Sequence, residues 1–160
     1  MSPTDWLRDL GLELPATPRL PPGHTTAFAW ALVVGTRLLV SGHGPQQPDG
    51  TPAGPFGRVP DAVSLDQAQR SARLCVLSVL GSVQRAIGDL DRIAAWVSVA
   101  GFVQARPGYP ETTAVLNAFS ELVLDVFGPA VGEHARTAIG VAALPLDLPV
   151  VVAAELALAG

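Results

Sequence analysis

A helical repeat of apolar positions occupies the middle of the chain. After the capping-box sequence Ser64-Leu-Asp-Gln67, apolar residues return every three or four positions. These residues are Leu65, Ala68, Ala72, Cys75, Val79, Val83 and Ile87. The spacing predicts a helix of about six turns that ends near Gly88. It also favours Cys75 as a buried small hydrophobe over Cys75 as a nucleophile.

Two further helices are predicted, one on each side of this segment. Residues 110–127 form the later one, and Gly128-Pro129 stops it. Its apolar face consists of Val115, Phe119, Leu122 and Val126. Residues 4–12 form a short amphipathic helix, followed by an extended proline-rich connector over residues 15–22. We expect residues 1–27 to be this helix and connector within one domain of residues 1–160.

Runs of β-branched and small apolar residues predict five strands. Residues 28–34 and 38–41 flank Gly35-Thr36, the usual signal of a hairpin. Residues 94–102 predict a third strand. Residues 137–144 and 150–158 lie on either side of a proline-bounded turn and predict two largely buried strands.

The predicted order of elements is helix, strand, strand, long helix, strand, helix, strand, strand. Helices on one face of a mixed sheet make an α+β sandwich. The loop over residues 42–60 holds five glycines and five prolines. A loop of this length either builds a functional site or interface or is idle, and the sequence leaves both open.

Composition indicates one apolar, cytosolic domain. Its 160 residues are 49% hydrophobic and only 15% charged, which predicts that apolar surface is covered in an oligomer. No apolar run reaches the roughly 20 residues of a membrane span, and the first residues lack the pattern of a signal peptide. We therefore expect a cytoplasmic protein with no membrane partner.

Several kinds of chemistry are disfavoured by what the sequence lacks. All ten cations are arginine, so catalysis through a lysine Schiff base is excluded. A net charge of −4 without a basic stripe argues against nucleic acid as a partner. One cysteine and three histidines without metal-ligand spacing argue against a metal site, and no nucleotide-binding fingerprint is present. No cofactor is expected.

Arg136 is the only cation in residues 134–160. A guanidinium stays charged and matches a carboxylate or phosphate, so a half-buried Arg136 implies a bound anion or an internal acidic partner. A surface arginine at a strand end is the alternative.

His43 follows Ser41-Gly42 at a strand end and could act as a general acid or base, although a hydrogen-bonded surface histidine is the commoner outcome. Glu155 is the only acid in the last strand, and it is expected near that strand's exposed end. Strand alternation places Val151, Ala153 and Glu155 on one face.

Three sequence stretches together resemble the Rid family, the reactive-intermediate deaminases also called YjgF proteins and historically L-PSP endoribonucleases. They are Leu39-Val40-Ser41-Gly42, Gly88-Asp-Leu-Asp-Arg-Ile93 with the strand that follows, and His134-Ala-Arg136-Thr-Ala-Ile-Gly-Val141 with Leu144-Pro145. The resemblance covers about residues 28–158 and is greatest for the longer branch of the family.

The resemblance implies a chorismate-mutase-like fold assembled as a homotrimer, with three pockets between subunits. It implies cofactor-free hydrolysis of imines and enamines of 2-amino acids to 2-oxo acids and ammonia. Arg136 matches the arginine that binds the substrate carboxylate. The other expected substrate-binding residues are Ser41, Gly42, Ala138, Ser120, Val151 and, from a neighbouring subunit, Phe28. Arg136 and His43 are the expected catalytic residues.

Four positions depart from the family pattern. Val151 stands where the deaminases carry a glutamate that activates water, and Ala138 replaces a cysteine. Phe28 replaces a pocket tyrosine, and His43 a common glutamine. Three hypotheses therefore stay open: an imine or enamine hydrolase, a biosynthetic enzyme catalysing cyclisation or tautomerisation, and a non-catalytic trimer that binds a small acid.

Overall fold

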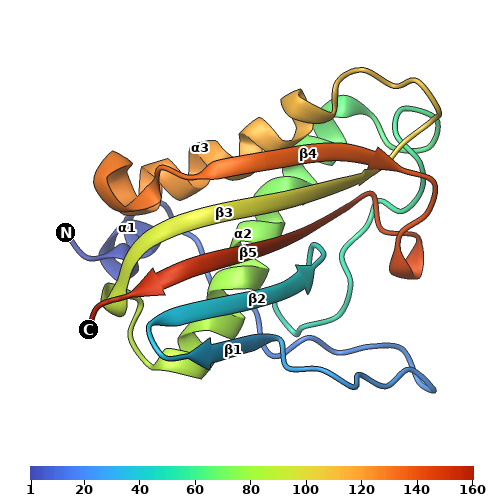
Figure 1. The fold of residues 1–160 in the computed structure, drawn as a ribbon. Helices are drawn as coiled ribbons and strands as arrows, with labels where there is room; N and C mark the ends of the chain where they lie inside the picture. The colour runs from blue at the N-terminus through green and yellow to red at the C-terminus, as the bar shows by residue number, and fades with distance from the viewer.

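A mixed five-stranded sheet covered on one face by two long helices forms the fold (Figure 1). The computed structural model describes residues 1–160. The strands are β1 (Ala31–Val34), β2 (Arg37–His43), β3 (Ile93–Gln104), β4 (Ala135–Val141) and β5 (Val150–Leu158). They lie in the order β1-β2-β5-β3-β4. Only β3 and β4 run parallel, so the predicted α+β class with a mixed sheet is confirmed.

Helix α2 (Leu65–Ile87) follows the predicted pattern closely. Ser64 caps its first turn in a capping box with Gln67, and Gly88 ends it with a φ of 84°. The predicted stripe is buried except for Leu65, which is partly exposed. Cys75 is fully buried in the core, and burial raises the pKa of its thiol, as expected of a packing residue.

Helix α3 (Thr112–Gly132) is broken at Gly128, where φ is 73°. The predicted stop at this glycine is therefore present, but the chain adds one more short helical turn after it. By length and composition alone α3 could span a membrane; here its apolar face packs on the sheet instead. Gly101 allows a close approach of β3 to α3, because a Cβ there would meet Leu116 Cγ at 2.4 Å.

The two C-terminal strands differ in burial, which corrects the prediction that both are largely buried. Strand β5 is central in the sheet and alternates between buried and partly exposed residues. Strand β4 is an edge strand and has no fully buried residue. It also ends earlier than predicted, at Val141, before a short 3₁₀ turn, η2 (Pro145–Asp147), leads to β5.

The N-terminal helix α1 (Pro3–Asp9) places Leu7 in the hydrophobic core, and Leu12 and Leu14 after it pack against that core. The connector runs beside the loop that follows β2: Ala16 N donates to Pro48 O at 2.9 Å, and Arg19 N donates to Gly50 O at 2.8 Å. The segment then continues to residues 28–30, which precede β1 and do not belong to it, contrary to the predicted strand start.

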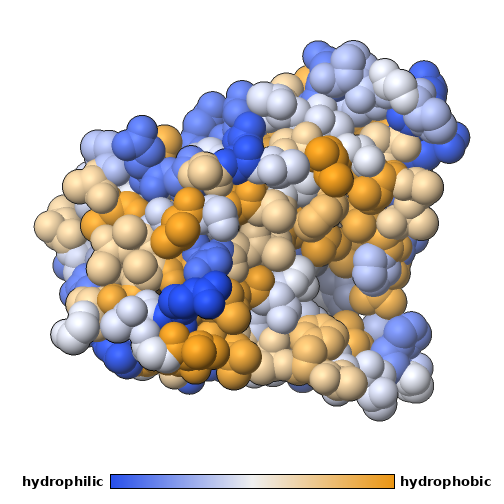
Figure 2. Space-filling model, viewed as in Figure 1, coloured by the Kyte–Doolittle hydropathy of each residue, from blue (hydrophilic) through white to orange (hydrophobic).

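The sheet face opposite the helices is open and largely apolar (Figure 2). Leu32, Val97 and Ile139 are among its exposed side chains. Glu155 lies on this face and forms an ion pair with Arg37, Nε to Oε1 at 2.7 Å. This pair lowers the pKa of Glu155 and accounts for an acid among apolar neighbours.

Candidate functional site

Arg136 lies on β4 and points toward helix α3. It stands opposite Val99 of β3 in the parallel ladder, and Val99 is buried beneath the helices, so Arg136 shares that face of the sheet. Its Nη1 donates to Ser120 Oγ at 2.8 Å, and its Nη2 donates to Asn117 Oδ1 at 2.9 Å. A longer contact joins Nη2 to the carbonyl of Thr113 at 3.5 Å. Three neutral oxygens on one helix therefore hold the guanidinium.

No acidic side chain pairs with Arg136, whereas four other arginines form ion pairs. Partial burial lowers the pKa of its guanidinium, the direction expected when a charge loses water without gaining a counter-charge. The Nε–H and one N–H of Nη1 make no hydrogen bond in the protein. Of the expected partners of a half-buried Arg136, an internal acid is absent from the single chain.

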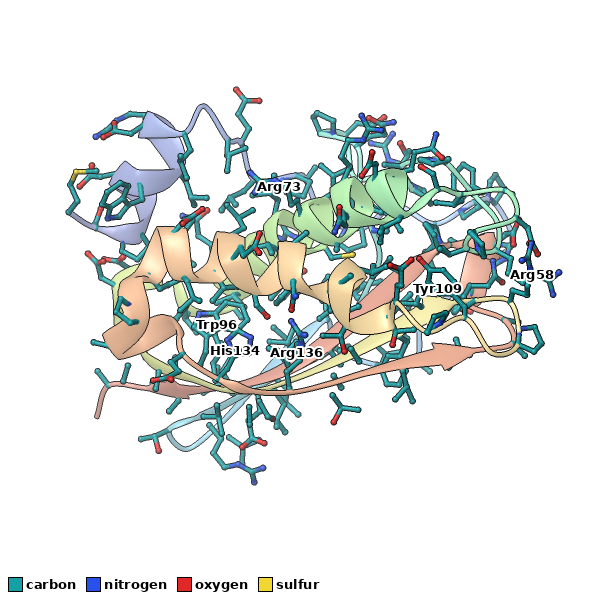
Figure 3. All side chains as sticks on the ribbon, turned by 90° about the horizontal axis from the view of Figure 1, so that it is seen from above. Arg58, Arg73, Trp96, Tyr109, His134 and Arg136 are labelled. Atoms are coloured by element: carbon teal, nitrogen blue, oxygen red, sulfur yellow. The ribbon has the colours of Figure 1, made fainter.

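Ser120 links Arg136 to His134, which lies beside it between α3 and the sheet (Figure 3). His134 Nδ1 is 2.6 Å from the carbonyl of Gly132, which can only accept, so this nitrogen carries the proton. Nε2 of His134 then accepts from the Ser120 hydroxyl at 2.9 Å. The Ser120 oxygen is thereby directed at Arg136 as an acceptor.

Ser120 is among the residues expected at the site, whereas Asn117 and His134 are not. The sequence spacing of each residue could have placed it beside an expected site residue. Asn117 is three residues before Ser120, which places the two on the same face of a helix. His134 is two residues before Arg136, which is the spacing of side chains on one face of a strand.

A cavity of about 370 Å³ lies at the end of β2, between the N-terminal connector and η2. Four of the expected site residues line it: Phe28, Gly42, His43 and Val151. Gly42 has no space for a side chain, because a Cβ there would meet Val151 Cγ1 at 2.9 Å. No aspartate or glutamate lines the cavity, so no carboxylate in it replaces the one absent at Val151.

His43 is buried, and both of its ring nitrogens are engaged inside the protein. Its exposed fraction is 1%. Nδ1 is 2.6 Å from the carbonyl of Ser41 and so donates to it, and Nε2 accepts from Ser82 Oγ at 2.8 Å. Burial, and to a lesser extent the positive charge of Arg85, lowers its pKa to about 4. His43 is therefore neutral near pH 7, and neither nitrogen is free for a substrate.

Arg136 and Val151 face opposite sides of the sheet in one chain, whereas His43, which also lines the cavity, faces the helices with its ladder partner Val152. Val150 and Val152 are buried beneath the helices, so Val151 between them faces the other way. Ala138 lies two residues beyond Arg136, packs against the core, and offers its carbonyl to Thr112 Oγ1 at 3.1 Å. The expected site residues thus form two groups that one chain does not bring together.

Ser41 belongs to neither group directly. Its hydroxyl donates to the carbonyl of Ala29 at 2.7 Å, and its backbone N–H donates to the carbonyl of Trp30 at 3.0 Å. These bonds fix the segment that carries Phe28 against β2. Ser41 therefore shapes the cavity wall through the backbone.

Known proteins resemble this chain in sequence and in fold. Protein TCP17 of Trypanosoma cruzi is 37% identical over 144 residues, which cover 90% of this chain and 86% of TCP17. The structure of a protein of unknown function from Agrobacterium tumefaciens has a TM-score of 0.87 at 32% identity and covers 98% of this chain and 92% of that one. The YjgF protein of E. coli shares the fold, with a TM-score of 0.60, 19% identity, and coverage of 88% and 92%. No family profile matches the chain.

The chain belongs to the Rid family, also known as the YjgF/L-PSP family, as the sequence motifs indicate. Its five-stranded mixed sheet with helices is the architecture of these structures.

The neutral His43 predicts a pH dependence of stability. A histidine whose folded pKa is lowered from 6.5 to about 4 stabilises the fold fully above pH 6.5 and loses that contribution as pH falls toward 4. We expect the wild type to lose about 2 kcal/mol more unfolding free energy between pH 7 and pH 5 than His43→Gln. Denaturant unfolding at both pH values, at one fixed protein concentration, measures this. His24→Gln, at an exposed histidine, serves as control, and equal losses in wild type and His43→Gln would contradict the assignment.

Proposed function

We propose that this protein binds a small carboxylate-bearing imine or enamine at Arg136 and accelerates its hydrolysis to a 2-oxo acid and ammonia. The observation that carries the proposal is the half-buried guanidinium held only by neutral oxygens, with two N–H groups unused. A carboxylate bound there gains charge-assisted hydrogen bonds in a partly desolvated place. The family resemblance supplies the same role for this arginine.

The complete site requires a second copy of the chain. Arg136 lies on the edge strand β4, whereas the cavity lies at the end of β2 and includes Val151, which faces the other side of the sheet, so one subunit does not bring Arg136 and Val151 together. The open sheet face is apolar, which favours its burial in an oligomer. We propose a homotrimer, as the family resemblance implies, in which Arg136 of one subunit meets the cavity of the next.

Val151 determines which part of the reaction the site can assist. Water adds to the imine carbon and one of its protons moves to the nitrogen; the second proton moves there as the carbon–nitrogen bond breaks, so that the water oxygen becomes the carbonyl and the nitrogen leaves as ammonia. Val151 accepts no proton, and the cavity holds no carboxylate, so the chain contributes binding and orientation of the substrate. Reactive imines also hydrolyse unaided, and we therefore expect modest acceleration.

The absence of a carboxylate from the cavity also favours a second candidate function, the cyclisation or tautomerisation of a larger carboxylate. Apolar residues such as Phe28, Leu148 and Val151 line the cavity, and they disfavour ordered water next to the reacting atoms. Such a reaction also needs Arg136, but it releases no ammonia. A cytoplasmic location suits either reaction.

Arg136→Ala tests the proposal. Imine generated in situ by an amino-acid oxidase should yield ammonia faster with the wild-type protein than alone. The variant should fall to the spontaneous rate, because loss of a charge-assisted hydrogen bond costs about 1.5–3 kcal/mol, or roughly 10- to 100-fold. Arg73→Ala, which removes an exposed arginine of α2 with no ion pair, should keep the wild-type rate. An equal rate for wild type and Arg136→Ala in folded protein would overturn the proposal.

Restoring a carboxylate at residue 151 tests the missing step. Val151→Glu should increase the rate of imine hydrolysis by about 10²–10⁴-fold, the usual contribution of a general base. Val151→Gln has nearly the same shape and no basic group, so it should give no comparable gain. If both variants behave alike in steady-state kinetics, the site does not support water activation at this position.

A further inference from the structure

We infer that the cavity beside Val151 accepts the side chain of the substrate, and that this side chain is large, not cationic and preferably aromatic. The inference rests on the proposed function for the position of the carboxylate at Arg136. It adds a substrate class, which the family resemblance and the comparisons do not supply for this chain.

The size of the cavity is the first argument. Its volume of about 370 Å³ exceeds what a small enamine fills. A space of this volume holds several water molecules in the absence of a ligand. A substrate with a one-carbon side chain would leave most of this volume wet, whereas a phenyl or indole ring would displace that water.

The walls of the cavity are the second argument. The rings of Phe28 and Trp30 meet edge to face, with centroids 4.9 Å apart and planes at 80°. This arrangement leaves an aromatic corner, and a third ring packs favourably against such a corner in offset or T-shaped geometry. Leu146 and Leu148 supply aliphatic wall. Phe28 is 52% exposed in the single chain, so ligand burial would remove apolar surface from water.

The contacts behind the aromatic corner of Phe28 and Trp30 indicate that this wall of the cavity is rigid. Trp30 also packs against His43, with ring centroids 5.0 Å apart. His43 is itself held by Ser82, while Ser41 donates to the backbone carbonyls of Ala29 and Trp30. The buried His43 therefore acts as a positioning residue for Trp30. A wall fixed in this way needs little ordering when a ligand enters.

Charge is the third argument, and it selects against a cationic side chain. The lining contains Arg19 and no aspartate or glutamate. His43 adds no charge near neutral pH because both nitrogens are engaged and its ring is buried. A lysine- or arginine-derived imine would therefore place a cation near Arg19 with no counter-ion in the cavity. A neutral aromatic side chain avoids this cost.

The reaction inferred is the hydrolysis of an arylalkyl 2-imino acid. Water adds its oxygen to the imine carbon, the carbon–nitrogen bond breaks, and the products are the aryl 2-oxo acid and ammonia. One water is consumed for each ammonia released, and no redox step occurs.

Competition between two imines tests the inference. An amino-acid oxidase supplies the imine of phenylalanine or that of alanine, and kcat/KM is measured for each. We expect the phenylalanine-derived imine to be preferred by at least about tenfold. Phe28→Ala should reduce this ratio severalfold. Phe56→Ala, which removes a phenyl ring of 45% exposure outside the cavity lining, should leave the ratio unchanged. A ratio near one, or a preference for the alanine-derived imine, would overturn the inference while the proposed hydrolase stands.

A binding measurement separates this inference from failure of the proposed function. Calorimetric titration with phenylpyruvate and with pyruvate requires no turnover. If neither imine is hydrolysed, tighter binding of phenylpyruvate that is lost in Arg136→Ala and weakened in Phe28→Ala supports the aromatic side-chain site without the hydrolase. Equal affinity for the two 2-oxo acids would overturn it.

Discussion

The Arg136 guanidinium, half-buried and without a counter-charge, is the constraint on which the functional site depends. Parallel pairing of β4 with β3 directs Arg136 toward α3, and the neutral oxygens of Asn117 and Ser120 hold it there. His134 fixes the Ser120 hydroxyl in turn. A carboxylate in place of these partners would have neutralised the charge inside the protein. Neutral partners orient the guanidinium of Arg136 and leave it able to bind an external anion.

The alternation of side chains across the sheet explains why the site is divided. Arg136 and Val151 occupy strands of the same sheet but face opposite sides, so the sheet separates the guanidinium from the Val151 wall of the cavity within one subunit. In the proposed trimer these two surfaces meet between neighbouring subunits, so that Val151 and the cavity of one subunit lie beside Arg136 of the next.

Local signals in the sequence were sufficient for most of the fold, and tertiary neighbours account for the errors. Ser64, Gln67 and Gly88 mark the ends of α2 because capping uses residues within one turn. The burial of β4 was mispredicted because edge position depends on strand order, which its own residues do not encode. His43 could be suspected of catalysis from its position, but its engagement with Ser82, 39 residues away, follows only from the packing of α2 on the sheet. The half-buried position of Arg136 agrees with what the sequence suggested, while its role in binding an anion stays a prediction.

The most direct test of a shared site between Arg136 and the cavity of a second subunit is an experimental structure of the assembled protein with phenylpyruvate bound. The account predicts the carboxylate within hydrogen-bond distance of Arg136 Nε and Nη1, and the phenyl ring against Phe28 and Trp30 of a second subunit. An aspartate or glutamate of a neighbouring subunit paired with Arg136, with the ligand bound elsewhere, would contradict it.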